Sequence, residues 1–221
     1  MKKYNYSQIK SNYNYSKSTK LSIPTFYDNN YLQNAFIGSV LLSAVTLQYK
    51  EEYLIDLASN LLMYDCRFTS SGENELDSRW AVTDGMIGDL PVEIKNRSKY
   101  DLGFFVKYPI LIEEKKLNSL KEKAVDGKSY YVNFVSQEEF SYNNKQQTSQ
   151  IKTYMIVHNA MEIEAELTQK LLPKETSGGK REMILKDVRF LSLEQGTIWD
   201  VTEELNNNIP SIIKSLEIGI K

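Results

Sequence analysis

The chain has 221 residues, a length that suits one domain. Hydrophobic residues make up 41% and charged residues 25%, so the chain can bury a sizeable core in the way of an ordinary globular protein. The net charge of −2 excludes a globally basic protein, so a surface that binds nucleic acid must come from local clusters of lysine and arginine.

The first part of the chain is predicted to contain a polar lead-in, a helical region and a hairpin. Residues 1–20 are mostly Lys, Tyr, Asn and Ser, and they are expected to form a solvated tail unless they pack on another surface. Apolar residues at three- and four-residue steps over 34–63 predict two helices or one bent helix. A weakly signalled strand over 66–68 follows, then a hairpin with strands over 79–84 and 92–97 and a turn region over 85–91.

The rest of the chain is predicted to mix helices and strands. The expected elements are a helix over 111–124, a turn at Asp126-Gly127, strands over 129–136 and 153–157, a helix over 161–172, a hairpin with strands 188–193 and 197–201, and a final helix over 209–220. The pattern of residues 102–106 does not decide between helix and strand. This order of elements predicts an α/β or α+β fold with a mixed central sheet in a single domain over residues 21–221.

The most informative motif is an acid followed, across the predicted hairpin, by an acid-x-lysine triplet. The acid is Asp84 and the triplet is Glu93-Ile94-Lys95. Since side chains alternate along a strand, Glu93 and Lys95 point to one face, while Ile94 can bury its side chain and still offer its carbonyl oxygen. Asp84 ends the partner strand and can reach the same point. The motif therefore predicts two carboxylates and an ammonium group close together.

This set of groups suits the hydrolysis of a phosphodiester. The reaction needs a hydroxide at neutral pH, neutralisation of charge on the phosphoryl oxygens, and an attacking and a leaving oxygen held in line. A carboxylate-bound Mg²⁺ ion, or Mn²⁺ in its place, can serve all three needs. Lys95 is placed to orient a water molecule or offset charge. Glu51 lies on the core-facing side of the predicted helix, where it either adds a ligand or reaches water at the edge of the apolar stripe.

On the residues Asp84 and Val92-Glu93-Ile94-Lys95, the chain resembles the PD-(D/E)XK nuclease superfamily, the restriction-endonuclease-like fold. The helix that carries Glu51, the hairpin, the later helix and the strand over 130–135 are similar to the αβββαβ order of that family, over about residues 45–136. A C-terminal α+β extension would follow this core. The sequence departs from the family pattern at Thr83, where the family name leads one to expect proline.

The resemblance implies roles for four residues. Asp84 and Glu93 would bind the metal, Lys95 would be the lysine of the family, and Glu51 would be its optional helix acid. Asp89, in the predicted turn, is more typical of a turn residue and serves only as a substitute if Asp84 is misplaced.

Several basic residues are candidates for contact with nucleic acid. Arg97 shares a face with Glu93 and Lys95 and could meet a substrate phosphate. Lys115 lies on the next predicted helix, and Lys180 and Arg181 follow a glycine pair that is typical of a mobile loop. For each of these residues, an ordinary solvated surface is the alternative interpretation.

Other chemistries find little support in the sequence. The single cysteine, Cys66, allows no disulfide within the chain, and a catalytic thiol would need the only histidine, His158, nearby. His158 could act as a general base, but a lone histidine without a motif is more often structural. There is no phosphate loop of the kind found in ATP-driven motors and no zinc-binding spacing of Cys and His. No apolar run reaches the roughly 18 residues of a membrane span, and no secretory signal is visible.

We therefore expect a cytoplasmic, Mg²⁺-dependent endonuclease that acts on DNA without membrane contact. The resemblance also allows a homodimer, because many nucleases of this fold pair to cut both strands. Three alternatives stay open: a surface hairpin with a solvated Glu93 and Lys95, a nuclease-like fold that binds nucleic acid without cutting it, and an assembly subunit that docks on a partner.

Overall fold

The computed structural model describes residues 1–12, 16–24, 30–46, 85–87, 90–143, 146–163 and 188–219. Within them, a seven-stranded sheet forms the centre of the molecule, with the order β1-β9-β7-β6-β4-β3 and with β2 paired to β6. Its strands are β1 (Lys2–Tyr4), β2 (Ser16–Ser18), β3 (Gly85–Ile87), β4 (Leu90–Asn96), β6 (Tyr130–Asn143), β7 (Gln146–Asn159) and β9 (Thr197–Asp200). The predicted α/β class with a mixed central sheet is confirmed, because β4 and β6 run parallel while the other described pairs are antiparallel.

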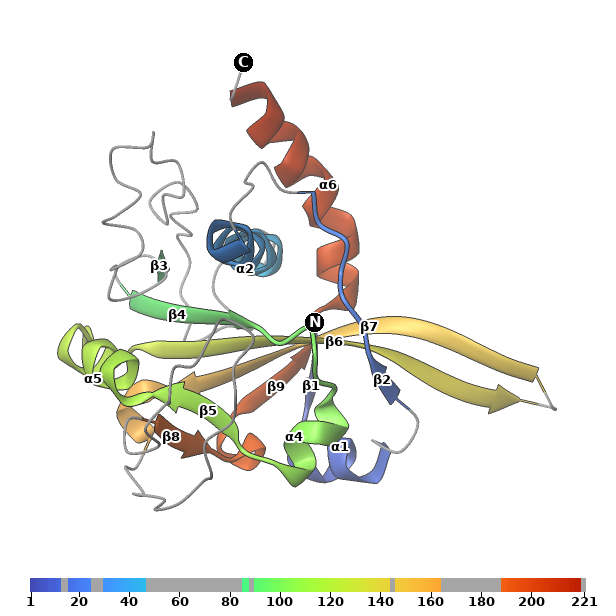
Figure 1. Cartoon of the computed structure of the whole chain (residues 1–221), viewed down its shortest axis with the longest axis horizontal. Helices are drawn as coiled ribbons and strands as arrows, with labels where there is room; N and C mark the ends of the chain where they lie inside the picture. The colour runs from blue at the N-terminus through green and yellow to red at the C-terminus, as the bar shows by residue number, and fades with distance from the viewer. Residues whose placement is uncertain are drawn as a thin grey trace.

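Both faces of the sheet are covered (Figure 1). One face carries the helices α2 (Asn30–Thr46) and α6 (Thr202–Gly219), which also contact each other. The opposite face carries α1 (Tyr6–Asn12), α4 (Leu102–Lys107) and a small antiparallel sheet of β5 (Ile110–Glu113) and β8 (Val188–Leu191). The helix α5 (Glu114–Glu122) lies at the end of the sheet where β6 begins.

Two apolar clusters fill the space between these layers. On the α2 side, side chains of α2 and α6 pack on Val92, Ile94, Val132 and Phe134 of the sheet. Gly38 allows α2 to approach β4 closely, because a Cβ atom at this position would lie 3.0 Å from Cγ2 of Ile94. On the other side, buried residues of α4, β5, α5 and β8 pack on the opposite face of β6, β7 and β9.

The parallel pairing of β4 and β6 determines how the intervening chain runs. Parallel neighbours need a crossover connection, and here it contains α4, β5 and α5. α5 packs through the buried residues Leu117 and Leu120, which the sequence correctly predicts as part of its inner side. The crossover therefore places α4, β5 and α5 beside the face of β4 that carries Glu93 and Lys95.

Three local predictions around the crossover need correction. The predicted helix over 111–124 begins only at Glu114, because residues Ile110–Glu113 alternate buried and exposed and form β5. The predicted turn region over 85–91 is shorter, since β3 occupies Gly85–Ile87 and β4 begins at Leu90. The undecided stretch becomes α4, whose first turn is capped by the Asp101 carboxylate accepting from the Phe104 N–H at 2.7 Å.

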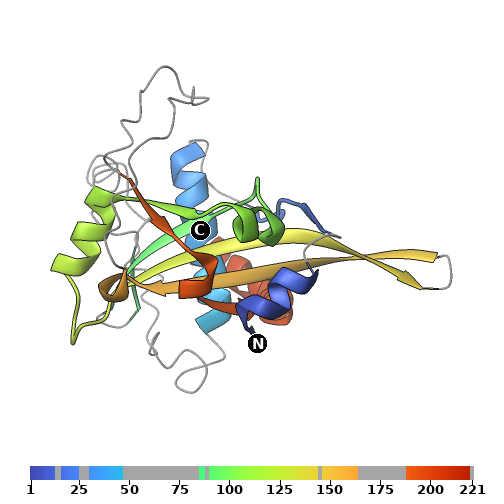
Figure 2. The same ribbon diagram turned by 90° about the horizontal axis from the view of Figure 1, so that it is seen from below.

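The hairpin of β6 and β7 is much longer than predicted. Each strand has 14 residues, paired from Tyr130↔Asn159 to Asn143↔Gln146, and the distal half projects beyond the rest of the sheet (Figures 1 and 2). The buried inner parts match the predicted strands over 129–136 and 153–157. The outer part is rich in Ser, Thr and Gln and lacks an apolar alternation, so the sequence did not signal it. The predicted turn at Asp126-Gly127 is confirmed, with φ of 50° and 71°.

The predicted hairpin over 188–201 is wrong. β8 pairs with β5 in the small sheet, while β9 inserts between β7 and β1 of the main sheet. The segment between them is a short 3-10 helix, Leu193–Gln195, closed by a capping box from Ser192. The predicted extension after residue 136 is thus partly a component of the main sheet. Of the predicted helix over 161–172, the structure describes residues 161–163, and a 3-10 helix spans Ala160–Glu162. The final helix, α6, begins at Thr202, seven residues before its predicted start at 209.

The lead-in over residues 1–20 is not a solvated tail where the structure describes it. β1 pairs with β9 at one edge of the sheet, and β2 pairs with β6 at the base of the long hairpin. The ammonium group of Lys3 lies 5.5 Å from the ring centroid of Trp199. From the sequence, this segment is expected to be ordered only if it packs on another surface, and that surface is the main sheet. Across the described helices, none is long and apolar enough to span a membrane.

Candidate functional site

β4 sends alternate side chains to opposite faces of the sheet, as predicted. Val92 and Ile94 are buried on the α2 side. Glu93 and Lys95 lie on the other side, near α5, and Arg97 follows on that same side, near β5. The acid and the lysine of the predicted triplet are therefore brought together by the pleat of a single strand.

Glu93 is the centre of the site. Its side chain is 0% exposed, and each of its carboxylate oxygens accepts a hydrogen bond from a lysine. Nζ of Lys95 lies 2.5 Å from Oε1, and Nζ of Lys116 lies 3.1 Å from Oε2. A buried carboxylate is costly unless opposite charge lies beside it. The side chains of Lys95 and Lys116 are 40% and 22% exposed, so a buried anion contacts two cations that are themselves partly exposed to solvent.

A second group of hydrogen bonds holds the strands around Glu93 in place. Nε of Arg97 donates to Oδ1 of Asn133 at 2.9 Å, and its Nη2 donates to the Tyr131 hydroxyl at 2.5 Å and to the Leu111 carbonyl at 2.9 Å. The Tyr131 hydroxyl donates to the same carbonyl at 2.8 Å. In the β4–β6 register, Tyr131 is the partner of Glu93. These bonds fasten β4, β5 and β6 to one another.

The predicted site residues have different outcomes. The structure brings Glu93 and Lys95 together. Arg97 makes the internal hydrogen bonds described above, and its contact with a substrate phosphate stays a prediction. Lys115 lies exposed on α5, and its contact with nucleic acid also stays a prediction. The backbone role of Ile94 is likewise untested, although its side chain is buried as expected. The following predicted residues lie outside the described part of the chain: Glu51, Cys66, Asp84, Asp89, Lys180 and Arg181.

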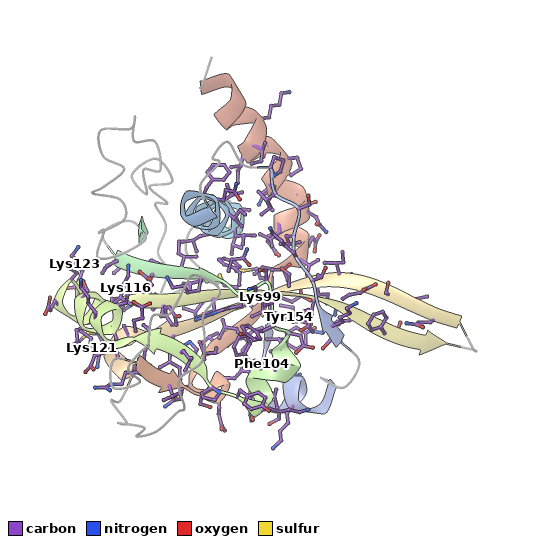
Figure 3. All side chains as sticks on the ribbon, in the orientation of Figure 1. Lys99, Phe104, Lys116, Lys121, Lys123 and Tyr154 are labelled. Carbon is purple, nitrogen blue, oxygen red and sulfur yellow. The ribbon has the colours of Figure 1, made fainter. Side chains whose placement is uncertain are left out.

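Sequence reasoning missed Lys116 as a site residue. It places this lysine among several solvated ones on a helix that begins too early. Lys116 precedes Leu117 by one residue and Leu120 by four, so it borders the buried side of α5. That spacing could have marked it as the lysine nearest to the sheet. Figure 3 labels Lys116 and Lys121 of α5 and Lys123 at its C-terminal end. Nζ of Lys121 donates to the Ile163 carbonyl at 2.9 Å.

The chemistry of Glu93 fits a hard cation, although one carboxylate is not a complete site. Carboxylate oxygens are the ligands that Mg²⁺ prefers. Among the residues that the structure describes, no three His, Cys, Asp or Glu side chains gather closely enough to hold a metal ion. The further acids predicted from the sequence, Asp84 and Glu51, lie outside those residues, and Asp84 directly precedes β3 in the sequence.

A second polar cluster lies on the same face, toward the base of the long hairpin. The Tyr154 hydroxyl donates to the Glu139 carboxylate at 2.5 Å, and Nζ of Lys152 donates to the same carboxylate at 3.1 Å. Burial and the hydrogen bond to Glu139 raise the pKa of Tyr154. For Lys152, burial opposes the charged form, but the hydrogen bond and charge of Glu139 outweigh it and raise the pKa. This cluster joins β6 to β7, and we assign it a structural role.

His158 occupies a structural position, in agreement with the interpretation that the sequence favours. It is 1% exposed, its Nε2 lies 3.0 Å from the Ser192 carbonyl oxygen, and a Cβ atom on Gly196 would lie 2.9 Å from its ring. The register Glu93↔Tyr131↔His158 separates His158 from Glu93 by two strand spacings, roughly 10 Å. Burial lowers the pKa of His158, against the opposing effect of its bond to Ser192.

The buried His158 predicts a pH-dependent stability. Because its pKa is lower in the folded chain, the unfolded chain binds the proton more readily as the pH falls below about 6.5. The free energy of unfolding should be highest above that pH and should fall by up to about 1.4 kcal/mol per pH unit below it, until the folded pKa is reached. Urea midpoints measured between pH 8 and pH 5 would show this slope. His158 is the only histidine, so His158→Gln should remove most of the slope, and an unchanged slope would contradict the assignment.

Compared with protein-family models, with curated proteins and with solved structures, the chain gives no significant match.

Proposed function

We propose that this chain is a metal-dependent endonuclease that hydrolyses DNA phosphodiester bonds, a Mg²⁺-dependent deoxyribonuclease. The observation that carries the proposal is the fully buried carboxylate of Glu93, with the ammonium group of Lys95 2.5 Å away on the same strand. The acid-x-lysine motif requires a carboxylate with an amine beside it on one strand. That strand, β4, pairs with β3, which directly follows Asp84 in the sequence.

The arrangement of the elements supports the same proposal. A helix precedes the hairpin of β3 and β4, and the chain then crosses over through α5 to the parallel strand β6. We take this order as support for a restriction-endonuclease-like core in which α4 and β5 are added within the crossover and β7 is an additional antiparallel neighbour of β6.

The residues can be given roles in the reaction. Glu93 and Asp84 would hold a Mg²⁺ ion, which supplies charge neutralisation and a hydroxide at neutral pH. Lys95 orients the attacking water and offsets negative charge on the phosphate. The attacking water gives up a proton to solvent as its oxygen forms a bond to phosphorus, the bond from phosphorus to the leaving oxygen breaks, and the leaving oxygen takes up a proton from solvent. Lys116 positions the Glu93 carboxylate from α5.

One observation favours a second candidate, an inactive protein with a nuclease-like fold that binds nucleic acid or assembles with a partner. Both oxygens of Glu93 accept hydrogen bonds from lysines. Two lysines around a buried carboxylate can hold a helix against a sheet without performing any chemistry. Activity, rather than binding, separates this candidate from the nuclease.

Metal removal is the direct test of the proposed function. Supercoiled plasmid incubated with the chain should be nicked in the presence of Mg²⁺ or Mn²⁺, because the metal supplies charge and hydroxide. EDTA should abolish the nicking, and added Mg²⁺ should restore it. Conversion of supercoiled to open-circular DNA on a gel measures the reaction. Plasmid that stays supercoiled with both metals would favour the inactive candidate.

A further inference from the structure

Three aromatic rings form a column along α4 and its flanks, in which the two terminal rings are exposed and the middle ring is partly buried. Tyr100, Phe104 and Tyr108 follow one another at four-residue steps. The rings of Tyr100 and Phe104 are stacked with centroids 4.3 Å apart, and those of Phe104 and Tyr108 lie 4.7 Å apart. Beneath them, Phe105 is 5% exposed and meets Phe104 edge to face at 5.4 Å. The column is therefore held in place by packing on its inner side.

The outer side of this column is open to solvent. Tyr108 is 56% exposed and Tyr100 is 39% exposed, and both rank among the exposed large hydrophobic side chains of the described chain. Rigid, exposed aromatic rings on a short helix are more typical of a binding surface than of a solvated helix face. An aromatic face can stack on any nucleobase, whatever the sequence of the nucleic acid.

A hollow of about 370 Å³ adjoins the Tyr108 end of the column. The described residues lining it include Tyr6, Lys107, Tyr108, Phe190, Leu193 and Gln195, and Lys107 is the only charged residue among them. Its size falls in the range of sites for small ligands. Aromatic rings within a lining that is mostly polar, together with one positive charge, suit a flat base attached to a phosphate.

Positive charge accompanies both ends of the column. Lys99, which is exposed, precedes Tyr100, and Lys107 precedes Tyr108 (Figure 3 labels Lys99 and Phe104). Lysine beside exposed aromatic rings favours a phosphate-bearing ligand over a protein partner, because lysine is depleted in protein–protein interfaces.

We propose that the column of Tyr100, Phe104 and Tyr108, with its adjoining hollow, binds unpaired bases of single-stranded DNA. This inference rests on the proposed nuclease function, which makes DNA the ligand. Tyr100 follows Lys95 by five residues, so their Cα atoms are at most roughly 18 Å apart. The Tyr100 end of the column therefore lies within the reach of a few nucleotides from the Lys95 side of the Glu93 site. The preferred substrate is DNA with an unpaired segment next to the bond that is cut.

The test is a binding measurement made without cleavage. Fluorescence anisotropy in EDTA compares a labelled single-stranded oligodeoxynucleotide with the duplex of the same sequence. The full chain should bind the single strand more tightly. Tyr108→Ala should weaken that binding by about tenfold, because it removes the open stacking face. Tyr108→Phe should retain the binding, since the ring remains. Ile151→Ala, at a residue 51% exposed on β7, serves as the matched control and should bind like the wild type.

The outcomes that overturn the inference are distinct from those that overturn the nuclease. Equal binding by the wild type and Tyr108→Ala, or a preference for duplex, would overturn it. Loss of self-association in Tyr108→Ala, measured by sedimentation, would assign the surface to a second copy of the chain and also overturn it. Tyr108-dependent binding of the single strand without any Mg²⁺-dependent nicking would support the inference and defeat the nuclease. Nicking without such binding would defeat the inference alone.

Discussion

Glu93→Gln should lower the rate of Mg²⁺-dependent plasmid nicking by about 10³-fold. Glutamine keeps the size of the side chain but removes the negative charge that would hold the metal. Loss of metal-assisted charge stabilisation amounts to several kcal/mol of barrier, and each 1.4 kcal/mol is tenfold in rate. Initial rates of nicking under saturating Mg²⁺ give the measurement. The sequence predicts a similar loss for Asp84→Ala.

The control for this substitution is Glu122→Gln. It makes the same change at an exposed acid of α5 and should leave the rate unchanged. Glu93→Gln also replaces the acceptor of two lysines, so its fold must be checked by circular dichroism and by its urea midpoint. A folded Glu93→Gln protein that nicks plasmid at the wild-type rate would remove Glu93 from the site and, with it, the basis of the proposed function.

The two lysines that share Glu93 should respond differently to the same substitution. Lys95→Met should reduce the nicking rate by about 10²-fold, because the 40% exposed Lys95 ammonium can reach a water molecule and a phosphate. Lys116→Met removes a less exposed ammonium that links α5 to β4. Its main effect should be a loss of about 1–2 kcal/mol of stability, with a much smaller effect on the rate.

This pair of variants is its own control, since both remove one positive charge from the same carboxylate. Nicking rates and urea midpoints should be measured on both proteins. Equal losses of rate would mean that the lysines act only through the charge of Glu93. A larger loss of rate in Lys116→Met than in Lys95→Met would exchange the roles proposed for them.

The sequence predicts the strands and turns whose formation depends mainly on the residues within each segment. Val92, Glu93 and Ile94 alternate in polarity, and the inner segments of β6 and β7 are continuous runs rich in aromatic and β-branched residues; each pattern produced a strand. Asp126-Gly127 predicted its turn because these residue types tolerate positive φ. The acid and the lysine on one strand face were therefore visible before the fold was known.

The remaining elements depend on contacts between distant parts of the chain. β1 contains Lys2, Lys3 and Tyr4, a sequence that does not predict a strand by itself. It becomes a strand because it pairs with β9. β5 was assigned to the helix that follows it because four residues give a weak signal and β8 lies far away in the sequence. The contact of Lys116 with Glu93 also depends on residues distant in the sequence. It forms only because α5 lies beside β4 in the folded chain.

The close contact of Gly38 with Ile94 links two layers of the molecule mechanically. Ile94 stands between Glu93 and Lys95, so the helix α2 presses on the back of the strand whose front carries the acid and the amine. A Cβ atom at position 38 would require the Ile94 side chain or the helix to shift by a few tenths of an ångström. The alignment of the Glu93 carboxylate and the Lys95 ammonium group thus depends on Gly38, a residue of a helix on the opposite side of the sheet.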